Sequence, residues 1–259
     1  MKFDDERTGT GTAEWAEVNE NICQGCSHDC LYCYAAYNAN RFHKRLRAEW
    51  AREELTKRAM ITSYPARDGV VMFPSSHDIT PFNLEAYIRV ARLILSKGNQ
   101  LLIVSKPHYE CVKQLLSELC GFRFQILFRF TIGTLDGPTS EFWEPGAPCP
   151  LERGSCLDSA YKAGFRTSVS IEPMLEGPEG AFAVVAASEP YVTDTIWIGK
   201  MNKIRLRVDM SKPENIAAVE KIKRQQRDTE ILYLWRLLND NPKIRWKDSI
   251  KEVLIRSKK

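Results

Sequence analysis

Three cysteines in one short stretch are the residues best suited to carry chemistry. Cys26, Cys30 and Cys33 have the spacing C-x3-C-x2-C, which allows three thiolates on one loop to turn toward a single metal centre. Soft sulfur ligands select zinc, copper(I) or iron–sulfur clusters. A cubane cluster usually takes four thiolates, so three leave one iron without a protein ligand. The stretch therefore predicts a metal centre with one position open.

A fourth cysteine keeps a second interpretation open. Cys23 lies three residues before Cys26, so the stretch also reads C-x2-C-x3-C-x2-C, a pattern of two zinc knuckles. Zinc sites of this kind normally separate their knuckles by a dozen or more residues. We therefore expect Cys23 to be a buried strand residue, although zinc on four thiolates remains the alternative.

The residues around the cysteines resemble a known family. The string from Gly25 to Ala35, with an aromatic residue directly before the third cysteine, is similar to the cluster loop of radical S-adenosylmethionine (SAM) enzymes, in particular the spore photoproduct lyase-like branch. A second tract matches the same branch and makes the resemblance more specific. It comprises Thr134-Leu135-Asp136, Glu144-Pro145, Ala147-Pro148 and Arg153.

The resemblance implies a set of cofactors and a reaction type. It implies a 4Fe-4S cluster on Cys26, Cys30 and Cys33, with SAM on the open iron. One electron, supplied by an external flavodoxin- or ferredoxin-type reductant, then cleaves SAM to methionine and a 5′-deoxyadenosyl radical. The resemblance also places Tyr32 against the adenine of SAM.

The elements that must position this loop alternate along the chain. Apolar runs predict strands at 15–22, 70–73, 101–104, 124–132, 167–171, 195–198 and 231–234, and helical patterns predict helices at 43–60, 84–95, 108–119, 151–163 and 213–227. Alternation of strand and helix predicts a parallel sheet. The predicted fold is therefore α/β, a partial (β/α)6 TIM-like barrel with a basic C-terminal helical extension.

Chemistry in such barrels gathers where the strands end, so these ends provide the candidate site. The second strand ends in Ser76, His77 and Asp78, and the third in Ser105 and Lys106. Arg129 interrupts the apolar fourth strand, where a guanidinium needs a partner. The candidates for cofactor binding are Tyr32, Ser76, Asp78, Ser105, Lys106, Arg129, Thr131, Ser170, Glu172 and Met174, with core packing as the alternative for Met174.

One departure from the family affects the reaction. Spore photoproduct lyase uses a cysteine at the end of its second strand to return a hydrogen atom, whereas this chain has Ser75-Ser76 there. An O–H bond is too strong for easy hydrogen donation, so repair of that photoproduct is not expected. The remaining candidates for a catalytic group are Cys149, as another hydrogen donor, and His77.

Composition and charge suggest where the protein is located and how its chain is organised. Scattered unpaired cysteines and the absence of an apolar leader or a roughly 20-residue apolar span predict a cytoplasmic protein with no membrane contact. The expected organisation is a disordered lead at 1–14, a radical SAM barrel at 15–200 and a basic extension at 201–259 packed on the barrel. The extension has 16 Lys and Arg against 8 Asp and Glu.

The basic extension favours DNA or RNA as a partner, with a solvated helix face as the alternative. The positions expected to contact phosphate are Lys221, Lys223, Arg224, Arg227, Lys243, Arg245 and Lys247. The leading hypothesis is thus a radical SAM enzyme acting on a nucleic acid or nucleotide. The alternatives are a radical SAM enzyme acting on a peptide or small metabolite, and a zinc or iron–sulfur interaction module without catalysis.

Overall fold

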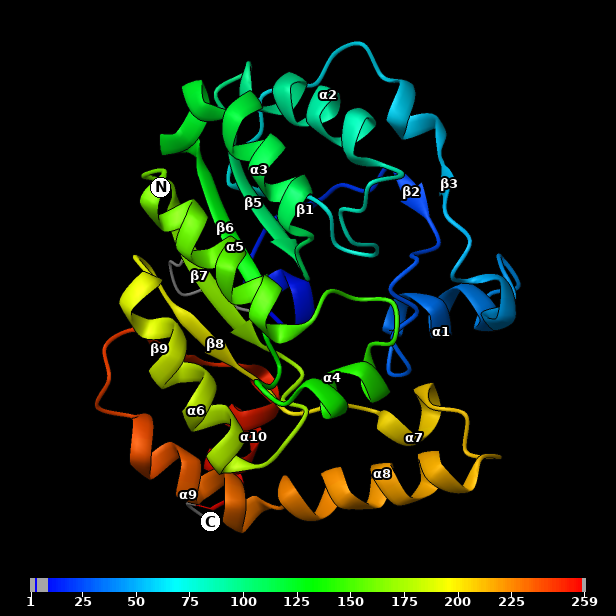
Figure 1. Cartoon of the computed structure of the whole chain (residues 1–259), viewed down its shortest axis with the longest axis vertical. Coiled ribbons are helices and arrows are strands. Elements are labelled where there is room, and N and C mark those ends of the chain that lie inside the picture. Colours follow the sequence, from blue (N-terminus) through cyan, green and yellow to red (C-terminus); the bar gives the residue numbers. More distant parts are fainter. Residues whose placement is uncertain (1–2, 4–8, 258–259) are drawn as a thin grey trace.

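The computed structural model describes residue 3 and residues 9–257, and its centre is a curled parallel sheet (Figure 1). Seven strands pair in the order β1-β4-β5-β6-β7-β8-β9, and each neighbouring pair is parallel. The strands are β1 Val18–Asn19, β4 Val70–Met72, β5 Gln100–Ser105, β6 Ile126–Thr131, β7 Arg166–Ile171, β8 Ile196–Ile198 and β9 Ile244–Trp246. Since β1 and β9 are the two edges of the described sheet, the barrel is open, as predicted.

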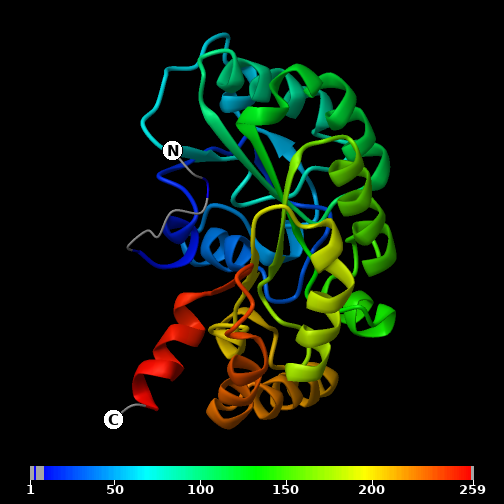
Figure 2. The same ribbon diagram turned by 90° about the vertical axis from the view of Figure 1, so that its left-hand side faces the viewer.

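Helices cover the outer face of this sheet (Figure 2). They are α2 Leu84–Leu95, α3 Tyr109–Glu118, α5 Pro150–Lys162, α6 Pro178–Ser188 and α9 Asp228–Leu238. Side chains alternate between the faces of a strand, and β6 shows the consequence. Phe128 and Phe130 join the large apolar core beneath the helices, whereas Leu127, Arg129 and Thr131 face the other way.

The opposite, concave face is closed at one end by the N-terminal segment. Phe3 and Trp15 pack with Met72, Leu127 and Trp197 in a second buried cluster. The guanidinium carbon of Arg129 lies 4.8 Å from the ring centroid of Trp15 and 5.3 Å from that of Trp197. This packing fills part of the barrel interior, and Trp15 and Met72 also line the open space at the carboxyl ends of the strands.

The remaining elements surround the carboxyl edge. A short antiparallel pair, β2 Cys23–Gln24 and β3 Glu54–Leu55, flanks the cysteine loop, which leads into α1 Tyr34–Arg41. On the other side lie α4 Gly137–Trp143, α7 Ile204–Arg207, α8 Pro213–Gln225 and α10 Asp248–Arg256. Most predicted strands and helices of the barrel are confirmed, and 84–95 is a helix over the predicted residues.

Three predictions of secondary structure are wrong. Residues 43–60 form two 3-10 turns around β3 rather than one helix, and residues 231–234 lie within α9 rather than in a strand. The predicted strand 15–22 is reduced to β1. The sequence predicted neither α6 nor β9. The strand β9 is the seventh strand of the sheet, and it lies in the segment 201–259 that was expected to be an extension.

The segment before β1 meets the segment after β9 on the open side of the barrel. Much of the predicted disordered lead, 1–14, lies outside the described residues, but Gly11–Glu14 forms a 3-10 helix. The Lys247 ammonium, directly after β9, lies 2.6 Å from a Glu14 carboxylate oxygen and donates to the Gly11 carbonyl at 2.7 Å. Both charged side chains are almost fully buried. The pair therefore anchors the beginning of the chain to its last strand.

Candidate active site at the carboxyl edge of the sheet

A cavity of about 740 Å³ opens at the carboxyl ends of the strands. Loops that follow β4, β5, β7 and β8 line it together with the cysteine loop, and Thr131 lines it from the end of β6. Cys26, Cys30 and Cys33 all reach this one cavity. Parallel strands therefore place the predicted strand-end residues and the predicted metal ligands around a single space.

Backbone contacts hold the cysteine loop in place. The Cys26 N–H donates to the Trp50 carbonyl at 2.9 Å. Gly25 has φ +87°, and a Cβ there would lie 2.2 Å from the Arg52 carbonyl oxygen, so only glycine fits this approach. Cys33 caps α1 by accepting the Ala36 N–H at its Sγ atom, at 3.4 Å. The loop is thus shaped by the segment 47–52.

Burial changes the acidity of the cysteine side chains. It raises the pKa of the thiols of Cys26, Cys30 and Cys33, because a thiolate loses its hydration in the protein interior. A bound metal ion would have to displace these protons, since the thiolate is the ligand form. The site therefore suits a metal that binds sulfur strongly.

The position of Cys23 separates it from the other three cysteines. It lies on β2 opposite Leu55, is 4% exposed and does not line the cavity, in agreement with the predicted buried strand residue. Within the described residues, the metal-binding side chains whose donor atoms come within 4.8 Å of one another are Cys26, His28 and Asp78. The four cysteines of the stretch, all of them described, are therefore not arranged around one tetrahedral ion.

Asp78 is the most highly connected carboxylate at the cavity. It accepts hydrogen bonds from the Ser105 hydroxyl at 2.8 Å and from the Lys106 N–H at 2.6 Å. Its second oxygen lies 3.7 Å from the Lys106 ammonium. Burial alone would raise the pKa of this carboxyl, but Lys106 and His28 outweigh burial and hold the pKa far below its usual value. The strand ends of β4 and β5 thus share one buried ion pair.

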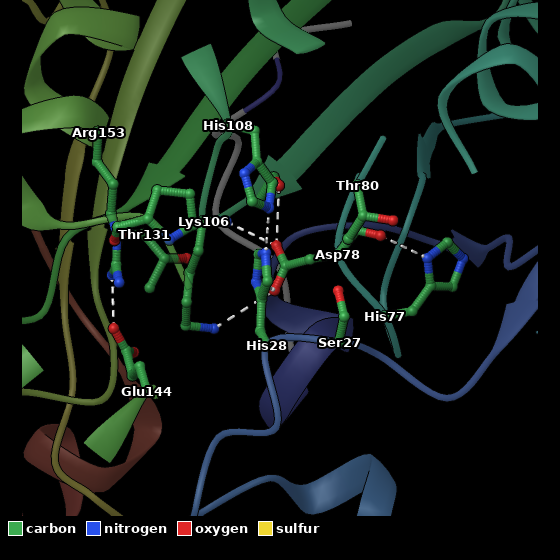
Figure 3. A network of polar contacts seen from close by, with 12 residues as sticks. Ser27, His28, His77, Asp78, Thr80, Lys106, His108, Thr131, Glu144 and Arg153 are labelled. Atoms are coloured by element: carbon green, nitrogen blue, oxygen red, sulfur yellow. Dashed lines mark hydrogen bonds and ion pairs between the residues drawn. The ribbon is translucent and has the colours of Figure 1, made fainter. Parts of the chain in front are cut away.

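Two histidines that the sequence did not indicate extend this network (Figure 3). His28, in the cysteine loop, is 0% exposed and places Nδ1 3.0 Å from an Asp78 oxygen. Its Nε2 lies 2.9 Å from Nε2 of His108. Because these residues are far apart in sequence, only the folded chain reveals them as a set. The set fixes the cysteine loop to the ends of β4 and β5.

A second buried network lies on the other side of the loop. The Tyr32 hydroxyl donates to Glu144. A Glu144 oxygen in turn lies 2.6 Å from the Arg153 guanidinium, and Figure 3 shows this ion pair. Arg153 also donates to the carbonyls of Pro148, at 2.7 Å, and Thr131, at 3.3 Å. The motif residues Glu144 and Arg153 therefore support the loop from behind rather than line the cavity.

The loop after α4 also contacts the cysteine loop through its backbone. The Gly146 N–H donates to the His28 carbonyl at 3.0 Å. A Cβ at Gly146 would lie 2.1 Å from the Ser27 carbonyl oxygen. A side chain at this position would push the two loops apart.

Most of the predicted cofactor-binding residues reach the cavity, as the prediction requires. What they bind stays a prediction. Those that line the cavity are Tyr32, Ser76, Asp78, Ser105, Lys106, Thr131 and Glu172. Ser170 pairs with Thr131 across β6 and β7 and is fully buried, and its hydroxyl has no hydrogen-bond partner among the described residues. Its role stays a prediction.

Three other predicted residues lie outside the cavity lining. Arg129 donates to the Ser168 hydroxyl at 2.9 Å, and its guanidinium carbon lies near the rings of Trp15 and Trp197, so these contacts hold it inside the barrel. Met174 belongs to the main apolar core, which was the alternative stated for it. Cys149 is exposed at the start of α5. Its position outside the cavity lining argues against a role as hydrogen donor there.

His77 lines the cavity, but backbone groups occupy both of its ring nitrogens. Its Nε2 accepts the Ile22 N–H at 3.3 Å, and its Nδ1 lies 2.9 Å from the Asp78 carbonyl, to which it must donate. Burial lowers the pKa of this imidazole, which agrees with a neutral ring. The contacts make His77 a structural link between β2 and the end of β4 instead of a free acid or base.

Glu172 has a partner that the sequence did not suggest. Its carboxylate lies 3.5 Å from the ammonium of Lys247, the buried lysine that also pairs with Glu14. Burial raises the pKa of the Glu172 carboxyl, and Lys247 offsets part of this effect. Lys247 is therefore not available for the expected phosphate contact, whereas Lys221, Lys223, Arg224 and Arg227 are exposed on or directly after α8.

The search for related proteins found one curated sequence relative and several solved structures, while no family model matches the chain. The relative is the uncharacterized protein ORF301 of Acidianus two-tailed virus, which is 27% identical over 173 residues. The match covers 60% of this chain and 54% of the viral protein, so the chain spans about half the length of that relative.

The solved structures share the fold. Spore photoproduct lyase complexed with dinucleoside spore photoproduct matches with a TM-score of 0.58 and 14% identity, over 94% of this chain and 78% of that one. A mutant of the same enzyme with bound AdoMet and the dinucleoside has a TM-score of 0.53 and 15% identity, over 87% and 63%. Streptococcus suis SuiB bound to precursor peptide SuiA has a TM-score of 0.53 and 10% identity, over 73% and 40%. The predicted partial barrel and its likeness to spore photoproduct lyase are confirmed at the level of the fold.

In the part of the chain that the structure describes, no helix combines the length and the apolar character that a membrane crossing requires.

Proposed function

We propose that this protein is a radical SAM enzyme with a 4Fe-4S cluster on Cys26, Cys30 and Cys33. The observation that carries the proposal is the convergence of these three cysteines, without Cys23, on one cavity at the carboxyl edge of a parallel half-barrel. The spacing of the cysteines and a fold shared with spore photoproduct lyase support it. When bound, the cluster and SAM supply a 5′-deoxyadenosyl radical by reductive cleavage of the cofactor.

The donor set fits a cubane better than a single ion. Three thiolates that bind three different irons must lie farther apart than ligands of one ion, and the three cysteines do not form a compact group of donor atoms among the described residues. The Sγ of Cys33 accepts a backbone N–H, and such hydrogen bonds tune the reduction potential of a cluster. The cavity beside the loop has room for a nucleoside cofactor.

The chain's own residues then have distinct tasks. Lys106, paired with Asp78, offers one ammonium to a carboxylate ligand near Cys30. Glu172 and Ser76 provide acceptors and a donor on the cavity wall for hydroxyl groups. Tyr32, fixed by Glu144, presents an aromatic face at the same cavity. The buried ion pairs behind these groups keep them oriented before any ligand enters.

A nucleic acid or nucleotide is the proposed substrate. The four exposed cations on and after α8 support this choice, as does the dinucleoside ligand named for the structurally similar lyase. A peptide is the second candidate, because the structurally similar SuiB is described with a precursor peptide. A flavodoxin- or ferredoxin-type protein as the electron donor, and a cytoplasmic location, belong to the same proposal.

Anaerobic reconstitution with iron and sulfide, followed by dithionite and SAM, tests the enzyme class. The expected product is 5′-deoxyadenosine, and single alanine variants of Cys26, Cys30 and Cys33 should lose both cluster iron and this product. The matched control is Cys23→Ala, which should keep both. Equal loss in Cys23→Ala, or one zinc ion per chain bound by all four cysteines, would support the interaction module instead.

A further inference from the structure

The segment after β8 gives the cavity a positively charged wall. The chain leaves the sheet at Gly199, turns at Lys203, which has φ +52°, and forms the short helix α7 that ends at Arg207. Lys200, Asn202, Lys203 and Arg207 all line the cavity. A left-handed lysine is uncommon and marks a position where the backbone is held against its own preference.

The cations on this wall differ in how they are neutralised. The Lys200 ammonium lies 3.7 Å from an Asp228 oxygen. Over the described residues, neither Lys203 nor Arg207 forms an ion pair, and the contact found for the Arg207 guanidinium is the ring of Tyr34, with 6.0 Å to its centroid. Burial lowers the pKa of Arg207, because a guanidinium loses hydration in the interior, and nearby groups that include Glu172 offset only part of this effect.

The other charged side chains that line the cavity are either members of an ion pair or carboxylates. Lys106 is paired with Asp78 beside the cysteine loop. On the wall formed by the chain ends and the end of β7 lie Asp248, Glu252 and Glu172. Two cations without an ion-pair partner among the described residues therefore share the cavity with these carboxylates, and this polarity favours one orientation of a ligand that is anionic at one end.

From this geometry we infer that Arg207, assisted by Lys203, binds a phosphate group of the substrate and so restricts it to phosphate-bearing nucleotides. A guanidinium presents two parallel N–H donors that match phosphate oxygens, and a lysine adds a compact positive charge. The hydroxyls and amino groups of the sugar and base would then face the carboxylates of the cavity. Because Arg207 lies beside Tyr34, next in sequence to Cys33, the anchored nucleotide is held close to the cysteine loop.

The inference rests on the proposed function, and substitution of Arg207 tests it by binding rather than by turnover. The probes are a dinucleotide with its phosphodiester and 5′-phosphate, and the same dinucleoside joined by a neutral linker. With the anaerobic, cluster-loaded protein and SAM, we expect the phosphorylated probe to bind at least about tenfold more tightly, which is the effect of one charged hydrogen-bonded contact. Arg207→Gln should abolish this preference, and Arg207→Lys should retain part of it.

The same helix provides the matched control. Arg205 is exposed and paired with Glu220, outside the cavity, so Arg205→Gln should bind both probes as the wild type does. SAM affinity should be unchanged in Arg207→Gln. A parallel loss of SAM affinity, or equal binding of the two probes by the wild type, would overturn the inference.

Competitors separate the possible sources of the phosphate. Displacement of the probe by a mononucleotide as effectively as by a single-stranded oligonucleotide indicates a free nucleotide, and stronger displacement by the oligonucleotide indicates a nucleic acid; both outcomes support the inference. If inorganic phosphate displaces the probe as effectively as the mononucleotide or the oligonucleotide does, recognition of a nucleotide is refuted. The production of 5′-deoxyadenosine is measured separately. If the wild type prefers the phosphorylated probe and Arg207→Gln does not, this result supports the inference even if no 5′-deoxyadenosine forms.

Discussion

Glu144 and Arg153 form an ion pair of 2.6 Å in which both side chains are almost completely buried, behind the cysteine loop. Tyr32 reaches this pair through its hydroxyl group, so a residue of the loop depends on a motif more than a hundred positions later. The pair explains why a tract outside the cavity accompanies the cysteines. It holds the loop in place from a position outside the cavity lining.

Replacing Glu144 by Gln should strongly destabilise the protein. Arg153 would keep its charge in the interior without a carboxylate, and breaking a buried pair in this way costs about 3–5 kcal/mol. Urea unfolding of the metal-free protein measures the change. Glu141→Gln, on the exposed side of α4, should change the free energy of unfolding by less than about 0.5 kcal/mol. Equal effects of the two variants would contradict a structural role for the pair.

Replacing Gly146 by Ala should disturb the cysteine loop more than the rest of the fold. The added Cβ would lie 2.1 Å from the Ser27 carbonyl oxygen, which is backbone and cannot rotate away. We expect cluster iron after reconstitution to fall severalfold, while the far-ultraviolet circular dichroism stays close to that of the wild type. Gly137→Ala is the control, because among the described residues nothing lies within 4 Å of the position that a methyl group would take at Gly137. Full iron loading in Gly146→Ala would show that the loops can separate without cost.

The stability of the protein should fall as the pH drops below the ordinary histidine pKa of about 6.5, in part through His77. Burial lowers the pKa of this imidazole in the folded chain, where the neutral ring accepts the Ile22 N–H at one nitrogen and donates to a carbonyl from the other. The unfolded chain therefore binds the proton first, and stability falls as the pH decreases through this range.

The contribution of one such histidine is at most about 1.4 kcal/mol per pH unit. In His77→Gln the slope of unfolding free energy between about pH 7 and about pH 5.5, the range around the ordinary histidine pKa, should be smaller than in the wild type, whatever the change in stability at neutral pH. An unchanged slope would mean that His77 takes up its proton equally well in the folded chain.

Replacing Lys247 by Met should loosen the contact between the segment 11–14 and the end of β9. It would leave Glu14 buried without its nearest cation and remove the bond to the Gly11 carbonyl, a loss of about 3–5 kcal/mol. Lys251→Met provides the control on α10, since this lysine is half exposed and lies 3.7 Å from the same carboxylate. Its removal should cost less than about 1 kcal/mol. Limited proteolysis should cleave the N-terminal segment faster in Lys247→Met than in the control variant.

The sequence by itself determined the alternation of strands and helices and the residues at the strand ends. Apolar runs such as 70–73 and 124–132 are long enough to show a buried strand, and 84–95 has an unambiguous helical period. Since parallel strands bring their carboxyl ends to one edge, the order of elements was sufficient to place Asp78, Lys106 and Thr131 near the cysteines.

Only the tertiary structure decided the elements whose local signal is weak. Residues 231–234 are a short apolar run, which fits a strand or a buried helical turn equally well, and packing against α6 makes it helical. Residues 43–60 have the composition of a surface helix, but contacts of 50–52 with Gly25 and Cys26 hold the chain in turns. Local propensity is a weak energy that such contacts override.

The partners of the charged residues were also beyond the sequence. Arg129 was expected at the cavity because a buried guanidinium needs a partner, and the structure places the Ser168 hydroxyl and two tryptophan rings beside it. His28 with His108, and Lys247 with Glu14, are pairs separated by 80 residues or more. Sequence patterns report on neighbours within a few residues, whereas the energy of a buried charge depends on whichever group the folded chain brings within a few ångströms.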